Sequence, residues 1–416
     1  MFEDILKKIK PSEEERKRVY EIIREIVERL EKRGLEVFLG GSFAKDTWIS
    51  NNYDIDLFIL FRDGEGISKK IEETLKEEKM DYAKVRGSRD YFKVFYKGME
   101  FELVPALKIG KVEDAENVID LSPFHVSYVR SKIEGTNLAD EVRLLKVFMK
   151  NIGTYGAESY VRGFSGYATE LLILYYKSFY NLILNTQDWR PKVFLDIEGY
   201  YNDIRKAINV MGKDKTKSPI IIVDPVYPVR NATSSVSVHK FAEFIYYSRI
   251  LLEEMRNGLD VSKYFEIKKK VDISKYLEYA KRYGANLLYI EIEGKGGSKD
   301  IKNTKALKFF KRLVKELEVN NFPILRKFVI FDEKVIGIIY VYLDKLLEYR
   351  KKEGPLVWDK ESFEKFLKKH RNEEVFVEED GRVYAIINKK VKLEEILEDM
   401  RNKYSNSIEK FYFKLY

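Results

Sequence analysis

Amphipathic helical segments alternate with short apolar strands in the first third of the chain. Residues 12–32 open with Ser12-Glu13-Glu14-Glu15, a capping box, and then place apolar side chains at helical spacing. The elements expected after it are a strand at 35–39, a glycine turn with a short helix through residue 48, a buried strand at 53–61, a helix at 68–79 and a hairpin of strands 91–96 and 99–105. This pattern predicts an α+β domain with a mixed or antiparallel sheet.

The pattern becomes mainly helical from about residue 139. The expected elements are a helix that stops near residue 153, a second at 165–184, an extended proline-bearing segment at 220–231 and a third helix at 237–255. Beyond residue 262 the order is a helix at 274–283, a strand at 286–292, a helix at 304–318 and strands at 326–331 and 335–342. The βαββ order indicates a ferredoxin-like α+β unit, and from residue 354 a helix and a hairpin at 379–382 follow.

The chain is therefore expected to be a multidomain α+β protein. Its 416 residues are enough for two to four domains. The expected domains are 1–138, 139–260, 261–350 and 351–416.

Two aspartates interrupt the apolar strand at 53–61. Asp54 and Asp56 are two residues apart, so both carboxylates are expected on one face of the strand. Adjacent carboxylates repel each other unless a cation lies between them, and Mg²⁺ prefers such oxygen ligands. A two-metal site needs a third carboxylate from a neighbouring strand, which we expect to be Glu102, with Glu100 on the same face as the alternative.

A Gly-Gly-Ser turn lies just before these aspartates. Gly40, Gly41 and Ser42 would present backbone N–H groups and a hydroxyl to phosphate oxygens, and Lys45 would add a positive charge. The alternative is an ordinary turn followed by a solvated lysine. A phosphate-binding turn beside a divalent-metal site indicates nucleotidyl transfer.

Four further residues have weaker signals of their own. Lys146 lies at the edge of an apolar helical stripe, where it could equally extend to solvent. The signals of His125 and Tyr155 are weaker still, and a lone histidine after Pro123-Phe124 is more often a hydrogen-bonded structural residue than a ligand. Arg230 follows a rigid proline-bearing segment and could stack on or hydrogen-bond a base.

Composition narrows the chemistry. The absence of cysteine excludes disulfides and thiolate chemistry, and three well-separated histidines disfavour a histidine metal site. The net charge of +8 favours a polyanionic partner. An acidic N-terminus and short apolar stretches indicate a cytoplasmic protein that does not enter a membrane.

Taken together, these motifs resemble the archaeal-type, class I CCA-adding enzymes, tRNA nucleotidyltransferases of the DNA polymerase β superfamily. The segments that carry the resemblance, in the family's order, are Gly41-Ser42-Phe43-Ala44-Lys45-Asp46-Thr47-Trp48, Asp54-Ile55-Asp56, Leu103-Val104-Pro105-Ala106, Ser122-Pro123-Phe124-His125, Glu141-Val142-Arg143-Leu144-Leu145-Lys146, Tyr155-Gly156-Ala157-Glu158, Arg162-Gly163-Phe164-Ser165-Gly166-Tyr167 and Val223-Asp224-Pro225-Val226 through Arg230-Asn231. They span roughly residues 1–256. The DxD element occurs throughout the superfamily, whereas the last two segments point to this class.

The resemblance implies a set of roles. The metal ligands would be Asp54, Asp56 and Glu102, and Arg230 would read the base together with the tRNA backbone. The residues implied to bind the nucleotide are Gly41, Ser42, Lys45, His125, Lys146 and Tyr155. The implied partners are tRNA, CTP and ATP, with Mg²⁺ as the cofactor, and a homodimer is left open. The domains would be catalytic (1–138), nucleotide- and base-recognising (139–260), an α+β body (261–350) and a tRNA-binding tail (351–416).

Two departures from the family leave alternatives open. The family usually has Asp at the position of Glu102, and residues 85–91 replace a common Ala-Glu-His-Pro-Tyr segment, so no function is assigned there. Another polymerase-β-type transferase, such as a poly(A) polymerase or oligoadenylate enzyme, is one alternative. A catalytically relict RNA-binding protein is the other.

Overall fold

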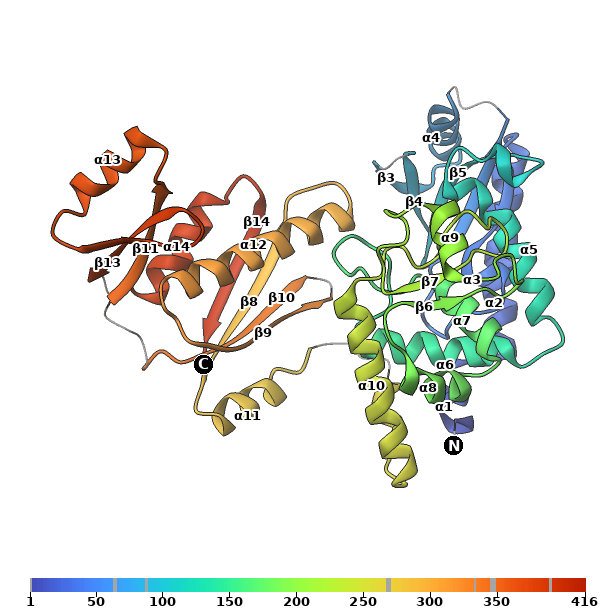
Figure 1. Cartoon of the computed structure of the whole chain (residues 1–416). Coiled ribbons are helices and arrows are strands. Elements are labelled where there is room, and N and C mark those ends of the chain that lie inside the picture. Colours follow the sequence, from blue (N-terminus) through green and yellow to red (C-terminus); the bar gives the residue numbers. More distant parts are fainter. Residues whose placement is uncertain are drawn as a thin grey trace. The chain divides into compact units, whose positions relative to one another are not determined.

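The computed structural model describes residues 2–62, 66–86, 89–266, 271–332, 334–344, 349–388 and 391–416. The chain divides into two compact units, Met1–Lys268 and Lys269–Tyr416, and each is described by itself (Figure 1). Within the described ranges, no helix is both long and apolar enough to cross a bilayer.

A five-stranded sheet organises the first part of unit 1. Its elements in chain order are α1 (Glu3–Ile9), α2 (Glu13–Lys32), β1 (Glu36–Leu39), α3 (Gly41–Ala44), β2 (Ile55–Phe61), α4 (Ile67–Glu77), β3 (Asp81–Val85), β4 (Tyr91–Tyr96) and β5 (Met99–Leu107). The strand order is β1-β2-β5-β4-β3, with β2 and β5 parallel and the other neighbours antiparallel. The predicted mixed sheet is confirmed, and Ser12 caps α2 by accepting from Glu15 N–H.

The apolar face of α2 packs on this sheet. Val19, Ile23, Ile26 and Leu30 are buried in one core with strand residues such as Leu57. Burying a side chain of this size contributes about 1.5–3 kcal/mol. The core therefore fixes β2, which carries Asp56, as a central strand.

Helices make up most of the rest of unit 1. They are α5 (Ser122–Ile133), α6 (Leu138–Asn151), α7 (Gly166–Tyr176), α8 (Phe179–Asn185), α9 (Ile204–Met211) and α10 (Val238–Arg256), with the small parallel pair β6 (Val193–Leu195) and β7 (Ile220–Ile222). A large apolar core joins α1, α6, α7, α8 and α10.

Three local predictions in unit 1 need correction. The helix expected through residue 48 ends at Ala44, because the chain turns at Asp46 (φ 53°) so that Trp48 stacks on Phe43 with ring centroids 4.7 Å apart. The single helix expected at 165–184 is two helices. Lys177 (φ 66°) ends α7 and Ser178 caps α8 by accepting from Asn181 N–H, a break that apolar periodicity does not reveal. The edge strand β3 was not predicted.

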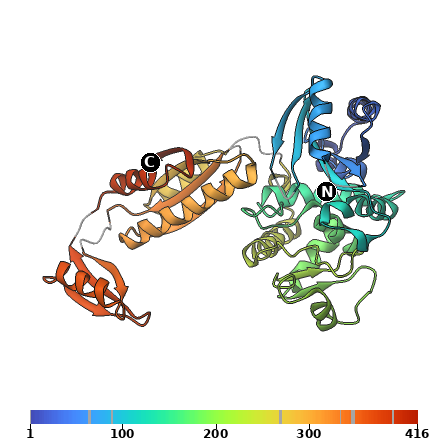
Figure 2. The ribbon, with the colours of Figure 1, turned by 90° about the horizontal axis from the view of Figure 1, so that it is seen from above.

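Unit 2 contains the predicted ferredoxin-like unit. Its elements are α11 (Ser274–Arg282), β8 (Asn286–Gly294), α12 (Lys299–Val319), β9 (Ile324–Phe331), β10 (Val335–Val341), α14 (Leu393–Lys403) and β14 (Ile408–Leu415). The antiparallel order β14-β8-β10-β9 is that of a split βαβ sheet, and α12 runs along one face of it (Figure 2). The helix α12 begins before the predicted residue 304, at Lys299, because Ser298 caps it.

A second small sheet is inserted between β10 and α14. It comprises β11 (Tyr349–Leu356), α13 (Lys360–Lys369), β12 (Glu374–Val377) and β13 (Arg382–Asn388), in the strand order β11-β13-β12. After the insertion the chain returns, so that β14 pairs with β8. The domain boundary expected at residue 350 therefore passes through one hydrogen-bonded sheet.

Candidate active site

A cavity of about 210 Å³ lies between the five-stranded sheet and the helices α6 and α7. Seven of the predicted site residues line it: Gly41, Ser42, Lys45, Asp54, Asp56, Lys146 and Tyr155. The predicted residues Glu102, His125 and Arg230 do not line it. The predicted phosphate-binding turn and the aspartate pair thus face one space, which they share with Lys45, Lys146 and Lys150.

The glycine turn approaches the aspartates closely. Gly41 has φ +55°, and a Cβ atom there would lie 1.8 Å from Oδ2 of Asp56. The N–H of Gly40 donates to the backbone oxygen of Asp56 at 2.9 Å. Only glycine fits at position 41, which brings the backbone N–H groups of the turn next to the carboxylate.

Asp56 lies in β2 and Asp54 immediately precedes this strand. In the parallel pairing of β2 and β5, Asp56 is opposite Glu102. Burial, followed by the charge of Glu102, raises the pKa of Asp56 to about 7; Asp54 adds to the rise and Lys45 opposes it. This mutual repulsion is what a bound divalent cation would relieve, and the oxygen donors suit Mg²⁺.

Glu102 is held by a lysine. Lys93 Nζ on β4 lies 3.0 Å from Oε1 of Glu102 and also forms an ion pair with Glu100. Among the residues that the structure describes, no group of three His, Cys, Asp or Glu side chains is close enough together to hold a metal ion. The register places Glu102 directly opposite Asp56, and Glu100 lies two residues earlier on the same face of β5.

Lys45 and Lys146 meet at a glutamate that the sequence did not single out. Glu170 Oε2 accepts from Lys45 Nζ at 2.5 Å, and its Oε1 lies 3.6 Å from Lys146 Nζ. Lys146 Nζ also donates to the backbone oxygen of Thr47 at 3.0 Å and to its hydroxyl at 2.9 Å. Lys146 is therefore buried rather than extended to solvent.

Tyr155 completes the helical side of the cavity. A Cβ atom at Gly166 would lie 2.9 Å from its hydroxyl, so this glycine makes room for the tyrosine. Lys150 Nζ lies 5.3 Å from the centroid of the Tyr155 ring. Burial raises the pKa of Tyr155, and the nearby acids Glu170 and Asp54 add to the rise, so its hydroxyl stays protonated.

His125 and Arg230 meet at Asp224. Asp224 Oδ2 lies 3.0 Å from His125 Nε2 and accepts from Arg230 Nη1 at 2.6 Å, while Oδ1 accepts from the Tyr167 hydroxyl at 2.9 Å. Tyr167 lines the cavity, and its ring lies 4.1 Å from the His125 ring and 5.8 Å from Lys45 Nζ. Tyr167 thus connects this cluster to the cavity.

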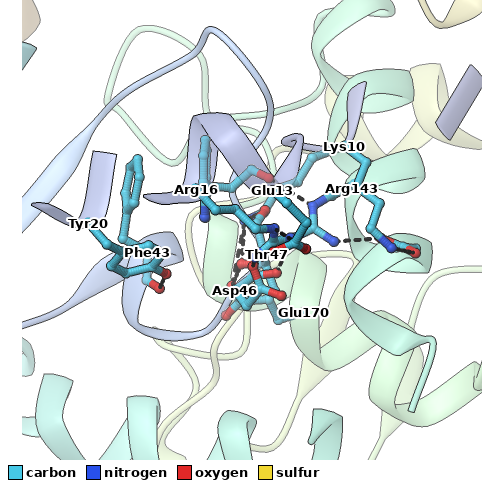
Figure 3. A network of polar contacts seen from close by, with 12 residues as sticks. Lys10, Glu13, Arg16, Tyr20, Phe43, Asp46, Thr47, Arg143 and Glu170 are labelled. Atoms are coloured by element: carbon cyan, nitrogen blue, oxygen red, sulfur yellow. Dashed lines mark hydrogen bonds and ion pairs between the residues drawn. The ribbon is translucent and has the colours of Figure 1, made fainter. Parts of the chain in front are cut away.

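A buried arginine holds the loop that follows Lys45 (Figure 3). Arg143, from α6, donates through Nε to the backbone oxygen of Trp48 at 2.8 Å and through Nη2 to Asp46 Oδ1 at 2.9 Å. Its Nη1 donates to Asp140 at 2.5 Å, and Arg16 pairs with Asp46 from the other side. This network fixes residues 46–48 between α2 and α6.

Four residues were not assigned to the site from the sequence: Arg143, Tyr167, Glu170 and Asp224. All of these except Glu170 lie inside the motifs quoted above. In the segment 85–91, Arg89 forms ion pairs with Asp120 and Glu116, whereas residues 87 and 88 lie outside the described residues.

The fold has clear structural neighbours. An RNA terminal uridylyl transferase, Cid1, superposes with a TM-score of 0.51 at 15% identity over 65% of this chain and 97% of that chain. A cytoplasmic RNA terminal U-transferase gives a TM-score of 0.50 at 17% identity over 64% and 97% of the two chains. A nucleotidyltransferase domain model matches residues 20–125. The fold and the domain match define a nucleotidyltransferase.

More specific matches cover two further parts of the chain. Residues 140–266 match the second domain of tRNA nucleotidyltransferase, and residues 300–410 match the C-terminal domain of the CCA-adding enzyme. The CCA-adding enzyme of Nanoarchaeum equitans is 39% identical over 384 residues, covering 91% of both chains. That of Sulfolobus acidocaldarius is 31% identical and covers 92% of this chain and 86% of its own. The chain belongs to the CCA-adding enzyme family.

Proposed function

We propose that this protein adds C, C and A to the 3′ end of tRNA from CTP and ATP, without a nucleic-acid template, and releases pyrophosphate. The observation that supports the proposal most directly is the single cavity shared by the Gly41–Ser42 turn, two lysines and the Asp54–Asp56 pair. Cationic groups for a triphosphate and carboxylates for divalent metal are thereby brought to one place.

The proposed metal ligands are Asp54, Asp56 and Glu102. Mg²⁺ bound there would supply a lowered pKa for the attacking 3′-hydroxyl and a counter-charge for the departing pyrophosphate. Glu102 is one methylene longer than the family's usual Asp, and its carboxylate forms an ion pair with Lys93.

The remaining cavity residues are proposed to bind the nucleotide. Backbone N–H groups at Gly41 and Ser42 would donate to phosphate oxygens, and Lys45 and Lys146 would offset the triphosphate charge. The protonated hydroxyl of Tyr155 would donate a further hydrogen bond. Because these donors are already in position before the nucleotide binds, the side chains need little reorganisation during nucleotidyl transfer.

Base recognition is proposed for the Asp224 cluster. Asp224 holds the guanidinium of Arg230 in one orientation and contacts His125 on the same carboxylate oxygen. A fixed guanidinium fork can donate to a base edge, while His125 would contact the nucleotide ribose or phosphates. Arg230 and His125 would therefore both be positioned by the buried carboxylate of Asp224.

The four-part division is kept in the proposal as a division of roles, although the pairing of β14 with β8 joins the last two parts in one sheet. Residues 1–138 would be catalytic, 139–260 would recognise nucleotide and base, 261–350 would form the body, and 351–416 would bind tRNA as a tail. The net charge of +8 is compatible with a polyanionic partner. We place the protein in the cytoplasm as a tRNA processing and repair enzyme; sedimentation of the full chain would show whether it forms a homodimer.

One incubation tests the proposal. A tRNA that ends before CCA is mixed with the protein, Mg²⁺, CTP and ATP, and the product length is read on a sequencing gel. Addition of C, C and A that stops after A is expected. Continued addition of A would instead indicate a poly(A) polymerase or oligoadenylate type of transferase. tRNA binding without any Mg²⁺-dependent product would indicate a relict RNA-binding protein.

A further inference from the structure

Four buried side chains form a polar ring with one branch in the wall of the cavity. Glu170 on α7 accepts from Lys45, the branch, at 2.5 Å and from the Thr47 hydroxyl at 2.8 Å. The Thr47 hydroxyl accepts from Lys146 on α6 at 2.9 Å, and Lys146 Nζ lies 3.6 Å from Glu170 Oε1, which closes the ring. Figure 3 shows Glu170 next to Thr47 in this network. Three separate segments of the chain thus meet at one carboxylate.

Lys45 and Lys146 place two positive charges in the ring, and Glu170 is the carboxylate that forms ion pairs with both. The side chains of Lys45 and Lys146 are 9% and 4% exposed and that of Glu170 is 1% exposed, so solvent screens their charges weakly. Although burial raises the pKa of Glu170, the charges of Lys45 and Lys146 lower it below its usual value, so the group is ionised. Two ammonium groups are therefore held around a single carboxylate.

A buried ion pair of this kind is weak evidence for a stabilising role, because desolvation offsets most of the attraction. Its position is more informative. All four members of the ring line the cavity in which the triphosphate is proposed to bind. Without a counter-charge, two neighbouring ammonium groups would repel each other or lose a proton before the nucleotide arrives.

We propose that Glu170 is a positioning residue that keeps Lys45 and Lys146 charged and adjacent for the triphosphate of the incoming nucleotide. Glu170 does not touch the reacting atoms; it acts through the two lysines and through Thr47. The phosphates are common to CTP and ATP, so Glu170 affects both nucleotides alike. This inference rests on the proposed use of the cavity for nucleoside triphosphate.

The test compares Glu170→Gln, Glu170→Asp and a surface control, Glu31→Gln, which also removes one negative charge from unit 1. Steady-state rates are measured with CTP and with ATP, and binding of ATP and of inorganic tripolyphosphate is measured by calorimetry without tRNA. For Glu170→Gln we expect KM for both nucleotides and both dissociation constants to rise about tenfold, the effect of about 1.4 kcal/mol. The KM for tRNA and the values for Glu31→Gln should stay at wild type, and Glu170→Asp, which restores the charge, should recover part of the loss.

A second variant is available if Glu170→Gln does not fold. Thr47→Val keeps the volume and every charge but removes the hydroxyl that joins Lys146 to Glu170. For this variant we expect the KM for both nucleotides to rise about threefold, less than for Glu170→Gln, because the two hydrogen bonds of the hydroxyl are lost while the charge of Glu170 stays.

The outcomes separate this inference from the proposed function. A lower kcat with unchanged KM and unchanged tripolyphosphate binding in Glu170→Gln and Thr47→Val would mean that Glu170 is only structural. If the wild-type protein binds neither ATP nor tripolyphosphate, the proposed use of the cavity is wrong. If it binds both but the Glu170 variants bind them equally well, only the role of Glu170 is overturned.

Discussion

A Cβ atom placed on Gly41 would lie 1.8 Å from Oδ2 of Asp56. The turn proposed for phosphate and the strand proposed for metal therefore share a contact that tolerates no side chain at position 41. We expect Gly41→Ala to lower nucleotide addition by two orders of magnitude or more, because the turn or the carboxylate must move, and small displacements at an active site cost about 100-fold. Rates and circular dichroism of the variant would be measured together.

Gly98→Ala is the matched control for this change. Gly98 has φ +78°, but a Cβ atom there meets nothing within 4 Å. It carries a similar backbone strain of about 1 kcal/mol without a collision. If both variants lost activity equally, the effect would come from backbone strain rather than from Asp56.

The Asp56 carboxylate itself should be indispensable. Asp56→Ala is expected to abolish nucleotide addition while leaving tRNA binding, measured by filter retention, near wild type. On β5, Glu102→Ala should match this loss, whereas Glu100→Ala, on the same face of the strand, should retain most activity. Robust addition by Asp56→Ala would contradict the assignment of the site.

Lys93 should weaken metal binding. Its ammonium group lies 3.0 Å from Glu102, so a cation bound by that carboxylate would be repelled by the charge of Lys93 and would compete with it for the same oxygen. Lys93 could also favour metal binding by orienting the longer Glu102 side chain, but this effect is worth only about 1 kcal/mol. We therefore expect Lys93→Met to lower the Mg²⁺ concentration at half-maximal rate. The control is Lys97→Met, whose partner is Glu25 on α2; a higher Mg²⁺ requirement for Lys93→Met would show that Lys93 orients Glu102.

Arg230 should decide base choice more than stability. Arg230→Ala removes the fork that Asp224 orients, so the ratio of kcat/KM for CTP and ATP on each tRNA end should shift toward unity. The thermal midpoint is expected to fall only modestly, because the buried Asp224 loses the charge of Arg230 but keeps His125 and Tyr167 as partners. Unchanged nucleotide preference would assign Arg230 a structural role only.

Asp224 should make stability depend on pH in the acid range. Although burial raises its pKa, the hydrogen bond and charge of His125 and the charge of Arg230 lower it to about 2. A lowered pKa in the folded state contributes stability above the unfolded pKa of about 4, and this contribution is lost as pH falls toward 2. The free energy of unfolding of wild type should thus exceed that of Asp224→Asn at pH 5, and the gap should shrink by about 2 kcal/mol below pH 4. The surface control Asp188→Asn should show no such convergence.

Local sequence was enough to predict the parts of the site that lie close together in the chain. The Gly-Gly-Ser turn and the aspartate pair are separated by eleven residues. The turn follows β1 and the aspartates lie at the start of β2, and these two strands pair, so the short spacing places both motifs at one edge of the sheet. The split βαβ order of unit 2 followed from the succession of its elements. The break at Lys177 did not, because the apolar spacing continues across it.

The sequence by itself determined the class of chemistry, through short-range motifs whose geometry depends on neighbouring residues. Only the tertiary structure decided which charges meet. Lys45 reaches Glu170 across 125 positions and His125 reaches Asp224 across 99, and no periodicity records such a separation. Packing of α6 and α7 against the turn buries these groups together, and burial is what makes their pairing necessary.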